Sequence, residues 1–232
     1  MASKVCLVTG VGPGTGAAIA RKFASDYEVA MVARSTDRLE GLAEESERLH
    51  AYPCDISDLE SLEKTYLQVQ SDLQPPDVIV HNAVYGLFGT FDKVKVGQFE
   101  KAFRLNASTL LFLGQLAAPK MIERQNGAIA ITGNTAAYRG VPNFAGFAPS
   151  KAAQRILAES LARTLGPSGI HVAYIAIDAV IATPGMRKAM ADKPVEFFAN
   201  PDDIAQHVWD VVHQPKSTWS FDSVIRPYGE SW

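Results

Sequence analysis

The sequence has few of the residues that would place it among disulfide-rich, metal-binding or secreted proteins. It has two cysteines, of which Cys6 is in a stretch expected to form a core strand and Cys54 lies near the end of another, so we predict reduced, structural thiols. Its five histidines do not show the spacing of metal ligands, and we expect no metal site. The first apolar run is too short for a secretory signal, which favours a cytoplasmic protein without a membrane partner.

Charge of one sign is not in excess either. The 22 lysines and arginines are scattered among 25 aspartates and glutamates, and the net charge of −3 leaves no basic stripe for nucleic acid. With 232 residues and 47% hydrophobic composition, the chain can bury one large core without needing a second. We therefore expect a single domain over residues 1–232.

What the sequence does contain is a regular alternation of strand-like and helix-like stretches. The expected strands are 4–8, 28–33, 50–53, 77–81, 128–132, 171–177 and 220–225, and the expected helices are 16–24, 36–49, 59–73, 98–124 with a bend, 149–165 and 202–213. Such alternation predicts an α/β fold built on a parallel sheet of seven strands. Ligands of such sheets bind at the carboxyl ends of the strands.

A glycine-rich turn joins the first expected strand to the first helix. Residues 9–16 read Thr-Gly-Val-Gly-Pro-Gly-Thr-Gly, so Gly10, Gly14 and Gly16 leave the backbone free of side chains at a helix N-terminus. Free N–H groups and the positive end of the helix dipole suit a pyrophosphate at this point. The turn therefore predicts a dinucleotide site, with a plain tight turn as the alternative interpretation.

Arg34 bears on the choice between the two nicotinamide cofactors. It follows the second expected strand, twenty positions after Gly14, where a carboxylate would bind the ribose 2′-hydroxyl of NAD. An arginine at this point suits the 2′-phosphate of NADP instead. NADP is therefore favoured over NAD, and the alternative is that Arg34 is only a solvated loop residue.

These motifs resemble those of the short-chain dehydrogenase/reductase family over essentially the whole chain. The family's Thr-Gly-x-x-x-Gly-x-Gly matches the glycine turn, and its helix-borne asparagine and its lysine match Asn106 and Lys151. The cofactor contacts that the resemblance implies are Gly10, Gly14, Gly16, Asp55, Ile56, Asn82, Ala83, Lys151 and Thr183. The resemblance implies an α/β fold of the Rossmann type, with a doubly wound, parallel, seven-stranded sheet and helices on both faces. It also implies an oxidoreductase that passes hydride between a nicotinamide cofactor and an alcohol or carbonyl.

The catalytic positions depart from the family pattern. The tyrosine of Tyr-x-x-x-Lys is Phe147 here, and the family serine falls on Asn134, or on Thr135 if the register slips by one. The Asn-Asn-Ala-Gly motif reads His-Asn-Ala-Val over residues 81–84, and the Pro-Gly after strand six reads Asp178-Ala179. Phenylalanine has no proton to move, and a positioned general acid or base contributes about 10² to 10⁴ in rate. We expect cofactor binding to survive and the family's usual proton transfer to be lost.

Several polar residues are candidates for the missing role. Asn134 can donate a hydrogen bond from its amide to a substrate carbonyl, as serine would. Asp178 ends an apolar strand, where burial would raise its pKa and make it an acid, whereas capping the loop is its alternative role. The hydroxyls of Tyr85 and Tyr138 either reach the substrate or only line its pocket. Lys151 is expected to bind the ribose whichever residue takes the role of the missing tyrosine.

The expected substrate pocket is apolar and suits a small to medium carbonyl compound. The residues expected to line it are Tyr85, Phe88, Tyr138, Phe144 and Phe147. The segment 180–200, which covers the substrate in the family, contains two methionines and is expected to be a mobile lid.

Two functions from different classes fit these observations. The first is an atypical NADP-dependent oxidoreductase acting on a largely apolar alcohol or carbonyl, and the second is a non-catalytic NADP-binding protein. The family associates through the helices expected at 98–124 and 149–165, which predicts a homodimer or homotetramer. The apolar residues of these helices exceed what one side of a sheet would bury, and the alternative is that they are simply core. They are Leu105, Leu110, Leu113, Leu116, Ala117, Ile156, Leu157, Leu161 and Leu165.

Overall fold

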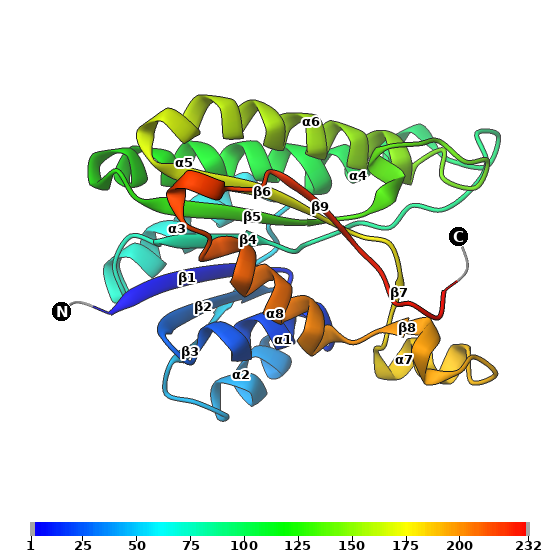
Figure 1. Ribbon diagram of the computed structural model, residues 1–232, viewed down its shortest axis with the longest axis horizontal. Coiled ribbons are helices and arrows are strands. Elements are labelled where there is room, and N and C mark those ends of the chain that lie inside the picture. The colour runs from blue at the N-terminus through cyan, green and yellow to red at the C-terminus, as the bar shows by residue number, and fades with distance from the viewer. Residues whose placement is uncertain (1–2, 231–232) are drawn as a thin grey trace.

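The computed structural model describes residues 3–230, which form a central sheet between two layers of helices (Figure 1). The seven strands of this sheet all run parallel, in the order β3-β2-β1-β4-β5-β6-β9. Their bounds are β1 Lys4–Thr9, β2 Tyr27–Ala33, β3 Leu49–Pro53, β4 Val78–His81, β5 Gly127–Gly133, β6 Ile170–Ile177 and β9 Asp222–Ile225. The predicted doubly wound fold is confirmed, and the strand order reverses between β1 and β4, where such sheets bind ligands.

The helices divide between the two faces of the sheet. One face is covered by α1 (Thr15–Phe23), α2 (Thr36–Ala43) and α8 (Pro201–Val212). The other is covered by α3 (Leu59–Asp72), α5 (Thr109–Arg124) and α6 (Phe147–Leu165), with α4 (Val96–Phe103) next to α6 (Figure 1).

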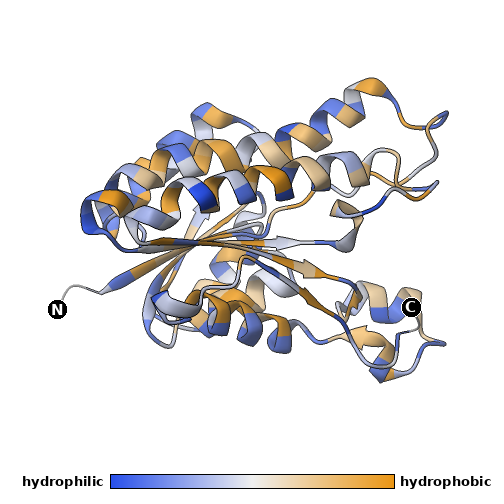
Figure 2. Ribbon diagram, turned by 45° about the horizontal axis from the view of Figure 1, so that its top comes forward, coloured by the Kyte–Doolittle hydropathy of each residue, from blue (hydrophilic) through white to orange (hydrophobic). Residues whose placement is uncertain are grey.

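The core lies on both faces because neighbouring strand residues point in opposite directions. In β1, Cys6 and Val8 pack under α1 and α8, whereas Val5 and Leu7 pack under α3 and α5. Figure 2 shows the resulting pattern, with apolar residues along the sheet and on the inner sides of the helices. Cys54, like Cys6, is buried and unbonded.

Two expected helices differ from those observed. The helix expected over 36–49 ends at Ala43, because Leu49 is already the first residue of β3 and pairs with Val29. The helix expected over 98–124 is divided by a π-helical turn, Arg104–Ser108, between α4 and α5. This turn contains Asn106, whose side chain is fully buried.

The segment expected to be a lid contains short regular elements that the sequence reasoning missed. Strands β7 (Val180–Ile181) and β8 (Phe198–Ala199) pair with each other, and α7 (Pro184–Ala189) lies between them. Thr183 caps α7 by accepting a hydrogen bond from the backbone N–H of Met186 at 3.2 Å. The Thr-Pro pair at residues 183–184 was the sequence signal for this helix.

The apolar residues expected to drive assembly lie mostly in the core, which corrects that expectation. Leu110, Leu113, Ala117 and Leu165 are buried, and Leu105, Leu116, Leu157 and Leu161 are partly buried against the core. Only Ile156 among the nine is well exposed, at 60%. Long leucine-rich helices are therefore explained here by packing on the sheet and on each other. No helix within residues 3–230 combines the length and hydropathy needed to cross a membrane.

Candidate active site

A cleft of about 460 Å³ lies at the carboxyl ends of β1, β2, β3 and β4. The predicted cofactor residues that line it are Gly10, Gly14, Gly16, Arg34, Asp55, Ile56, Asn82, Ala83 and Thr183, and Tyr85 lines it as well. Arg38, which sequence reasoning missed, is also at its wall. Arg38 lies in the first turn of α2, shortly after the end of β2 where Arg34 stands, and this position at the carboxyl edge of the sheet was the available signal.

The glycine turn lets three segments of backbone approach one another closely. Gly10 has a φ of +73°, and a Cβ atom there would lie 2.5 Å from the Cα of Ala83. A Cβ atom at Gly14 would lie 2.7 Å from Cγ2 of Thr183, so Thr183, the last predicted cofactor residue, lies close against the glycine turn. No side chain caps the N-terminus of α1, so the first N–H groups of this helix have no side-chain partner. This cradle fits a phosphate group.

Asn82 fixes the floor of the cleft by linking three strands. Its Nδ2 donates to the carbonyl oxygen of Gly10 at 2.8 Å, and its Oδ1 accepts from the Thr132 hydroxyl at 2.8 Å. Asp55 lies at the end of the cleft, where the Ser57 hydroxyl and the nearby Arg34 and Lys101 charges lower the pKa of its carboxyl. Asp55 is thus a carboxylate at neutral pH, and the hydrogen bond from Ser57 is the largest cause of its lowered pKa.

Asn106 connects two parts of the site through hydrogen bonds of its side chain. Its Oδ1 accepts from the backbone N–H of Tyr85 at 2.9 Å, and its Nδ2 donates to the Ser150 hydroxyl at 2.9 Å. The Ser150 hydroxyl donates in turn to the carbonyl oxygen of Phe147. The loop after β4 is therefore tied to the first turn of α6.

Lys151 is buried next to Phe147, in the first turns of α6. Its Nζ donates to Oε1 of Gln154 at 2.7 Å and lies 5.9 Å from the centre of the Phe147 ring. Burial without a carboxylate partner lowers the pKa of Lys151 to about 7. Lys151 is only 2% exposed and, unlike the other predicted cofactor residues, it does not line the cleft.

The side chain of Asn134 is engaged with the backbone around it. Its Nδ2 donates to the carbonyl oxygen of Ile177 at 2.8 Å, and its Oδ1 accepts from the N–H of Ala136 at 2.8 Å. The second bond caps the short 3-10 turn Thr135–Ala137. One of its two amide hydrogens is therefore already used, so its role toward a substrate stays a prediction.

The expectation of a raised pKa for Asp178 is wrong. Burial opposes its ionisation, but hydrogen bonds from the Thr135 hydroxyl and from Arg226 outweigh burial and lower the pKa of this carboxyl. Arg226 lies after β9, and no local sequence pattern predicted that it would return to the end of β6. Asp178 is a carboxylate at neutral pH and not a proton donor.

Aromatic rings cluster beside the expected reaction centre. The ring of Phe88 lies 5.4 Å from that of Phe144 and 5.2 Å from that of Phe147, and Phe88 is 63% exposed. Tyr138 lines a neighbouring cleft together with Phe144, but its hydroxyl is engaged because it donates to Asp222. Burial, followed by this bond, raises the pKa of Tyr138 to about 12. The three phenylalanines thus form an apolar rim, whereas Tyr85 belongs to the cofactor cleft.

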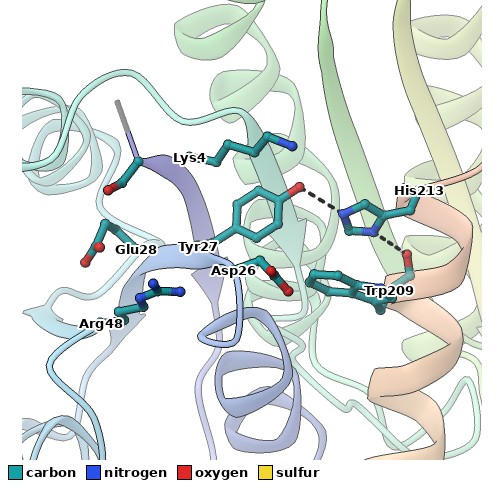
Figure 3. A pocket seen from close by; sticks show the side chains of 8 residues that line it. Lys4, Asp26, Tyr27, Glu28, Arg48, Trp209 and His213 are labelled. Atoms are coloured by element: carbon teal, nitrogen blue, oxygen red, sulfur yellow. Dashed lines mark hydrogen bonds between the residues drawn. The ribbon is translucent and has the colours of Figure 1, made fainter. Parts of the chain in front are cut away.

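A second cleft, of about 510 Å³, opens at the opposite, N-terminal edge of the sheet (Figure 3). There the Tyr27 hydroxyl and Nε2 of His213 lie 3.0 Å apart, and Nδ1 of His213 lies 2.7 Å from the carbonyl oxygen of Trp209. None of the predicted site residues lines this cleft. Within residues 3–230, no group of three or more His, Cys, Asp or Glu side chains is placed to hold a metal ion.

Comparison with known proteins agrees with this geometry. The model of the short chain dehydrogenase family matches residues 4–194. The 7alpha-hydroxysteroid dehydrogenase of Escherichia coli is 28% identical to this chain, and the match covers 97% of this chain and 93% of that enzyme. Carbonyl reductase (NADPH) 2 of Sus scrofa is 25% identical, with 94% and 93% covered.

Two solved structures are similar to this one over nearly their full lengths. The alcohol dehydrogenase of the archaeon Thermococcus sibiricus, complexed with 5-hydroxy-NADP, has a TM-score of 0.87 and 26% identity, and the match covers 99% of this chain and 98% of that one. A metagenomic short-chain oxidoreductase in complex with NADP has a TM-score of 0.83 and 25% identity, with 97% of each chain covered.

Proposed function

Because this chain belongs to the short-chain dehydrogenase family, we propose that it is an atypical NADP-dependent oxidoreductase. Its substrate is a small to medium, largely apolar alcohol or carbonyl compound. The observation that carries the proposal is the cleft at the carboxyl ends of β1–β4, which combines a side-chain-free cradle with two arginines.

NADP fits the residues of this cleft. Gly10, Gly14 and Gly16 would receive the pyrophosphate, and Arg34 with Arg38 would pair with the 2′-phosphate. Two similar solved structures hold NADP or a derivative of it, which supports the same cofactor here. When bound, the cofactor supplies or accepts the hydride.

The remaining predicted cofactor residues have distinct tasks in this proposal. Asp55 and Ile56 bind the adenine end, Asn82 and Ala83 border the middle of the cofactor, and Lys151 binds the nicotinamide ribose. Thr183, at the start of α7, closes over the glycine turn because it already contacts Gly14. The lid over residues 180–200 would then move as the substrate enters.

The apolar rim supports an apolar substrate. Phe88, Phe144 and Phe147 lie in mutual contact, and a shallow cleft of about 450 Å³ beside Phe144 is lined largely by alanine, valine and proline. Such walls stabilise hydrocarbon groups, and the polar side chains at this cleft are those of Tyr138 and Arg139. The relatives named for a hydroxysteroid and for carbonyl reduction are consistent with this class of substrate.

A non-catalytic NADP-binding protein is the second candidate, and Phe147 favours it. Phe147 has no proton to transfer, and both the Asn134 oxygen and the Asp178 carboxylate are engaged within the fold. A protein that only binds NADP needs the cleft and not the proton donor. The enzyme is nevertheless preferred, because Lys151 stays buried beside Phe147 with a lowered pKa.

The test is to incubate the protein with NADPH and a panel of carbonyl compounds while following cofactor oxidation. Sustained turnover supports the enzyme, and turnover that disappears in the double variant Arg34→Ala, Arg38→Ala shows that it depends on this cleft. Tight NADPH binding without turnover over a broad panel supports the second candidate. Failure to bind NADPH at all contradicts both.

Assembly and location are also part of this proposal. The exposed apolar residues on α5 and α6 are Leu111, Ile122 and Ile156, and a symmetric contact between these helices would cover them. We place the protein in the cytoplasm because both of its cysteines are reduced and buried, as in proteins of that compartment.

A further inference from the structure

A cluster of buried polar side chains lies between α6 and the sheet, beside the Phe147 ring. Lys151 and Gln154 come from α6, and His81 comes from β4, where the family has asparagine. Nζ of Lys151 donates to Oε1 of Gln154 at 2.7 Å, and Nδ1 of His81 lies 3.1 Å from the Thr9 hydroxyl. These four side chains are at most 2% exposed.

Stability alone does not explain this cluster. Nε2 of His81 and Nε2 of Gln154 are buried without a hydrogen-bond partner within residues 3–230. Buried polar atoms are normally paired, and leaving them unpaired destabilises a fold. Apolar residues at positions 81 and 154 would avoid that cost, so the polar side chains need another reason to be there.

Lys151 is the member of the cluster that can carry a proton at neutral pH. Burial, assisted by the charge of Lys151, lowers the pKa of His81 to about 3, so His81 is neutral. The neighbours that accept hydrogen bonds from Lys151 are the uncharged amide of Gln154 and the backbone carbonyl of Thr132. No described carboxylate pairs with Lys151, and its pKa of about 7 lies close to operating pH.

The other ionisable groups near the site are poorer donors. Asp178 is ionised, and Tyr138 holds its proton up to a pKa of about 12. Glu230 has a raised pKa, because of burial and the nearby Asp178, and it is the one serious rival. Glu230 belongs to the C-terminal segment, however, whereas Lys151 lies against the residue that replaces the tyrosine.

We infer that Lys151 takes the place of the missing tyrosine as proton donor, and that Gln154 is the positioning residue that holds its ammonium group. The inference rests on the proposed function. In the reduction, the carbonyl carbon accepts the hydride while its oxygen accepts a proton from Nζ of Lys151. The C=O double bond becomes a single bond, one N–H bond breaks and one O–H bond forms. The neutral amine then regains a proton from solvent.

Gln154 acts through Lys151 and not on the substrate. Its amide oxygen stabilises the ammonium form without the charge of a carboxylate, which would hold the proton too tightly to release it near neutral pH. A hydrogen bond to a charged group changes a pKa by about one unit or more, which is tenfold in the ionised fraction. Removing that oxygen should therefore lower the pKa of Lys151, and a carboxylate in its place should raise it.

The experiment measures the pKa of Lys151 and the pH dependence of turnover on the same proteins. Wild type, Gln154→Met and Gln154→Glu are titrated by NMR with isotope-labelled lysine, and each is assayed for NADPH oxidation with an accepted carbonyl. We expect the NMR midpoint near pH 7 in wild type to fall by about one unit in Gln154→Met and to rise in Gln154→Glu. The midpoint of the rate profile should move by the same amount in the same direction.

Glu230→Gln is the matched control, because it removes the rival carboxyl and should leave both midpoints unchanged. Opposite shifts in the two Gln154 variants guard against misfolding, since a damaged fold would not raise one midpoint and lower the other. The inference is overturned if turnover persists while the midpoint of the rate profile does not move with the NMR midpoint of Lys151. It is also overturned if the midpoint of the rate profile shifts in Glu230→Gln. Normal NADPH binding without turnover in any protein overturns the proposed function, and the inference with it.

Discussion

Arg226 donates a hydrogen bond from its Nη2 to the Asp178 carboxylate at 2.5 Å, and this pair joins the end of β6 to the segment after β9. The two side chains are 19% and 21% exposed, so the pair is largely shielded from water. The Thr135 hydroxyl donates to the other oxygen of the same carboxylate. Asp178 therefore anchors three segments at the carboxyl edge of the sheet, which is a structural role and not that of an acid.

We expect Asp178→Asn to lower the free energy of unfolding by about 1–2 kcal/mol at pH 7, because it removes a charge-assisted bond. The native pKa of Asp178 is lowered, so its contribution is complete above the ordinary value of about 3.9 and is lost as the pH falls through the native value. Urea unfolding near pH 7 and near pH 3 measures this loss and its dependence on pH. The control Asp192→Asn, at an exposed position, should not change the free energy of unfolding at either pH. An equal loss in Asp178→Asn at the two pH values would contradict the view that the stabilisation comes from the charge of Asp178.

Local patterns explain why so much of the fold was predictable. The seven strands and most helices follow from runs of apolar residues bounded by turn residues, and the glycine turn places β1 and α1 by itself. The end of α2 was misplaced because Leu49 is held by its pairing with Val29, a contact between strands that no local pattern contains. The leucines of α5 and α6 were misjudged for the same reason, since burial depends on which helix packs against which.

The cofactor preference should depend on Arg34 and Arg38 together. Each can donate to the 2′-phosphate of NADPH, and NADH has no such group. We expect Arg34→Ala to weaken NADPH binding about tenfold or more, Arg38→Ala to add to the loss, and NADH binding to change little. Titration of cofactor fluorescence measures the affinities of wild type and the arginine variants for NADPH and for NADH. Arg163→Ala, on the exposed end of α6, is the control, and equal NADPH and NADH affinities in wild type would sink the argument.

The reaction centre was less predictable than the cofactor cleft because its contacts span long stretches of sequence. The cleft residues follow elements in order, so their positions are set by the sheet topology. By contrast, Asn134 bonds to the backbone of Ile177, and Tyr138 bonds to Asp222. Both partners are distant in sequence, and both contacts remove polar groups that motif spacing alone leaves available.

Phe147→Tyr should raise turnover of an accepted carbonyl, by a factor within about 10² to 10⁴ if proton transfer limits the rate. The new hydroxyl would stand one helical turn before Lys151, whose charge lowers a tyrosine pKa below its usual value of about 10. Steady-state kcat/KM measures the gain. Phe144→Tyr is the control, because it adds a hydroxyl to the same aromatic cluster but has no lysine one helical turn later. It should give no gain in kcat/KM.

The companion change Asn134→Ser should help the chemistry and weaken the fold. Serine restores the family hydroxyl, but it removes the bonds of Asn134 to Ile177 and Ala136. We expect a loss of about 1–2 kcal/mol in unfolding free energy, measured by urea titration. If the double variant with Phe147→Tyr binds NADPH normally yet reduces nothing in a broad carbonyl panel, the family's chemistry does not apply to this site.

Lys151→Met should stabilise the protein below neutral pH while weakening cofactor binding. The native pKa of Lys151 is about 7 and its ordinary value is about 10.4, so between these values the unfolded chain binds more protons than the native one. Wild-type stability should therefore rise with pH across this interval, and the variant should lack that slope. Urea unfolding at pH 6, 8 and 10 tests this, with the exposed Lys64→Met as control. A wild-type slope retained in Lys151→Met would assign the titration to another group.

The exposed apolar residues of α5 and α6 give the last prediction, which concerns assembly. Ile156 is 60% exposed on α6, and a large aliphatic side chain in that position costs little in a monomer but is stabilised in a symmetric helix contact. Light scattering at micromolar concentration should give two or four times the chain mass of 25.1 kDa, and Ile156→Glu should shift it toward 25.1 kDa. Leu67→Glu, at a position on α3 that is 53% exposed, should leave the mass unchanged. A wild-type mass near 25.1 kDa would show that these helices do not form a subunit contact, and that the site is complete within one chain.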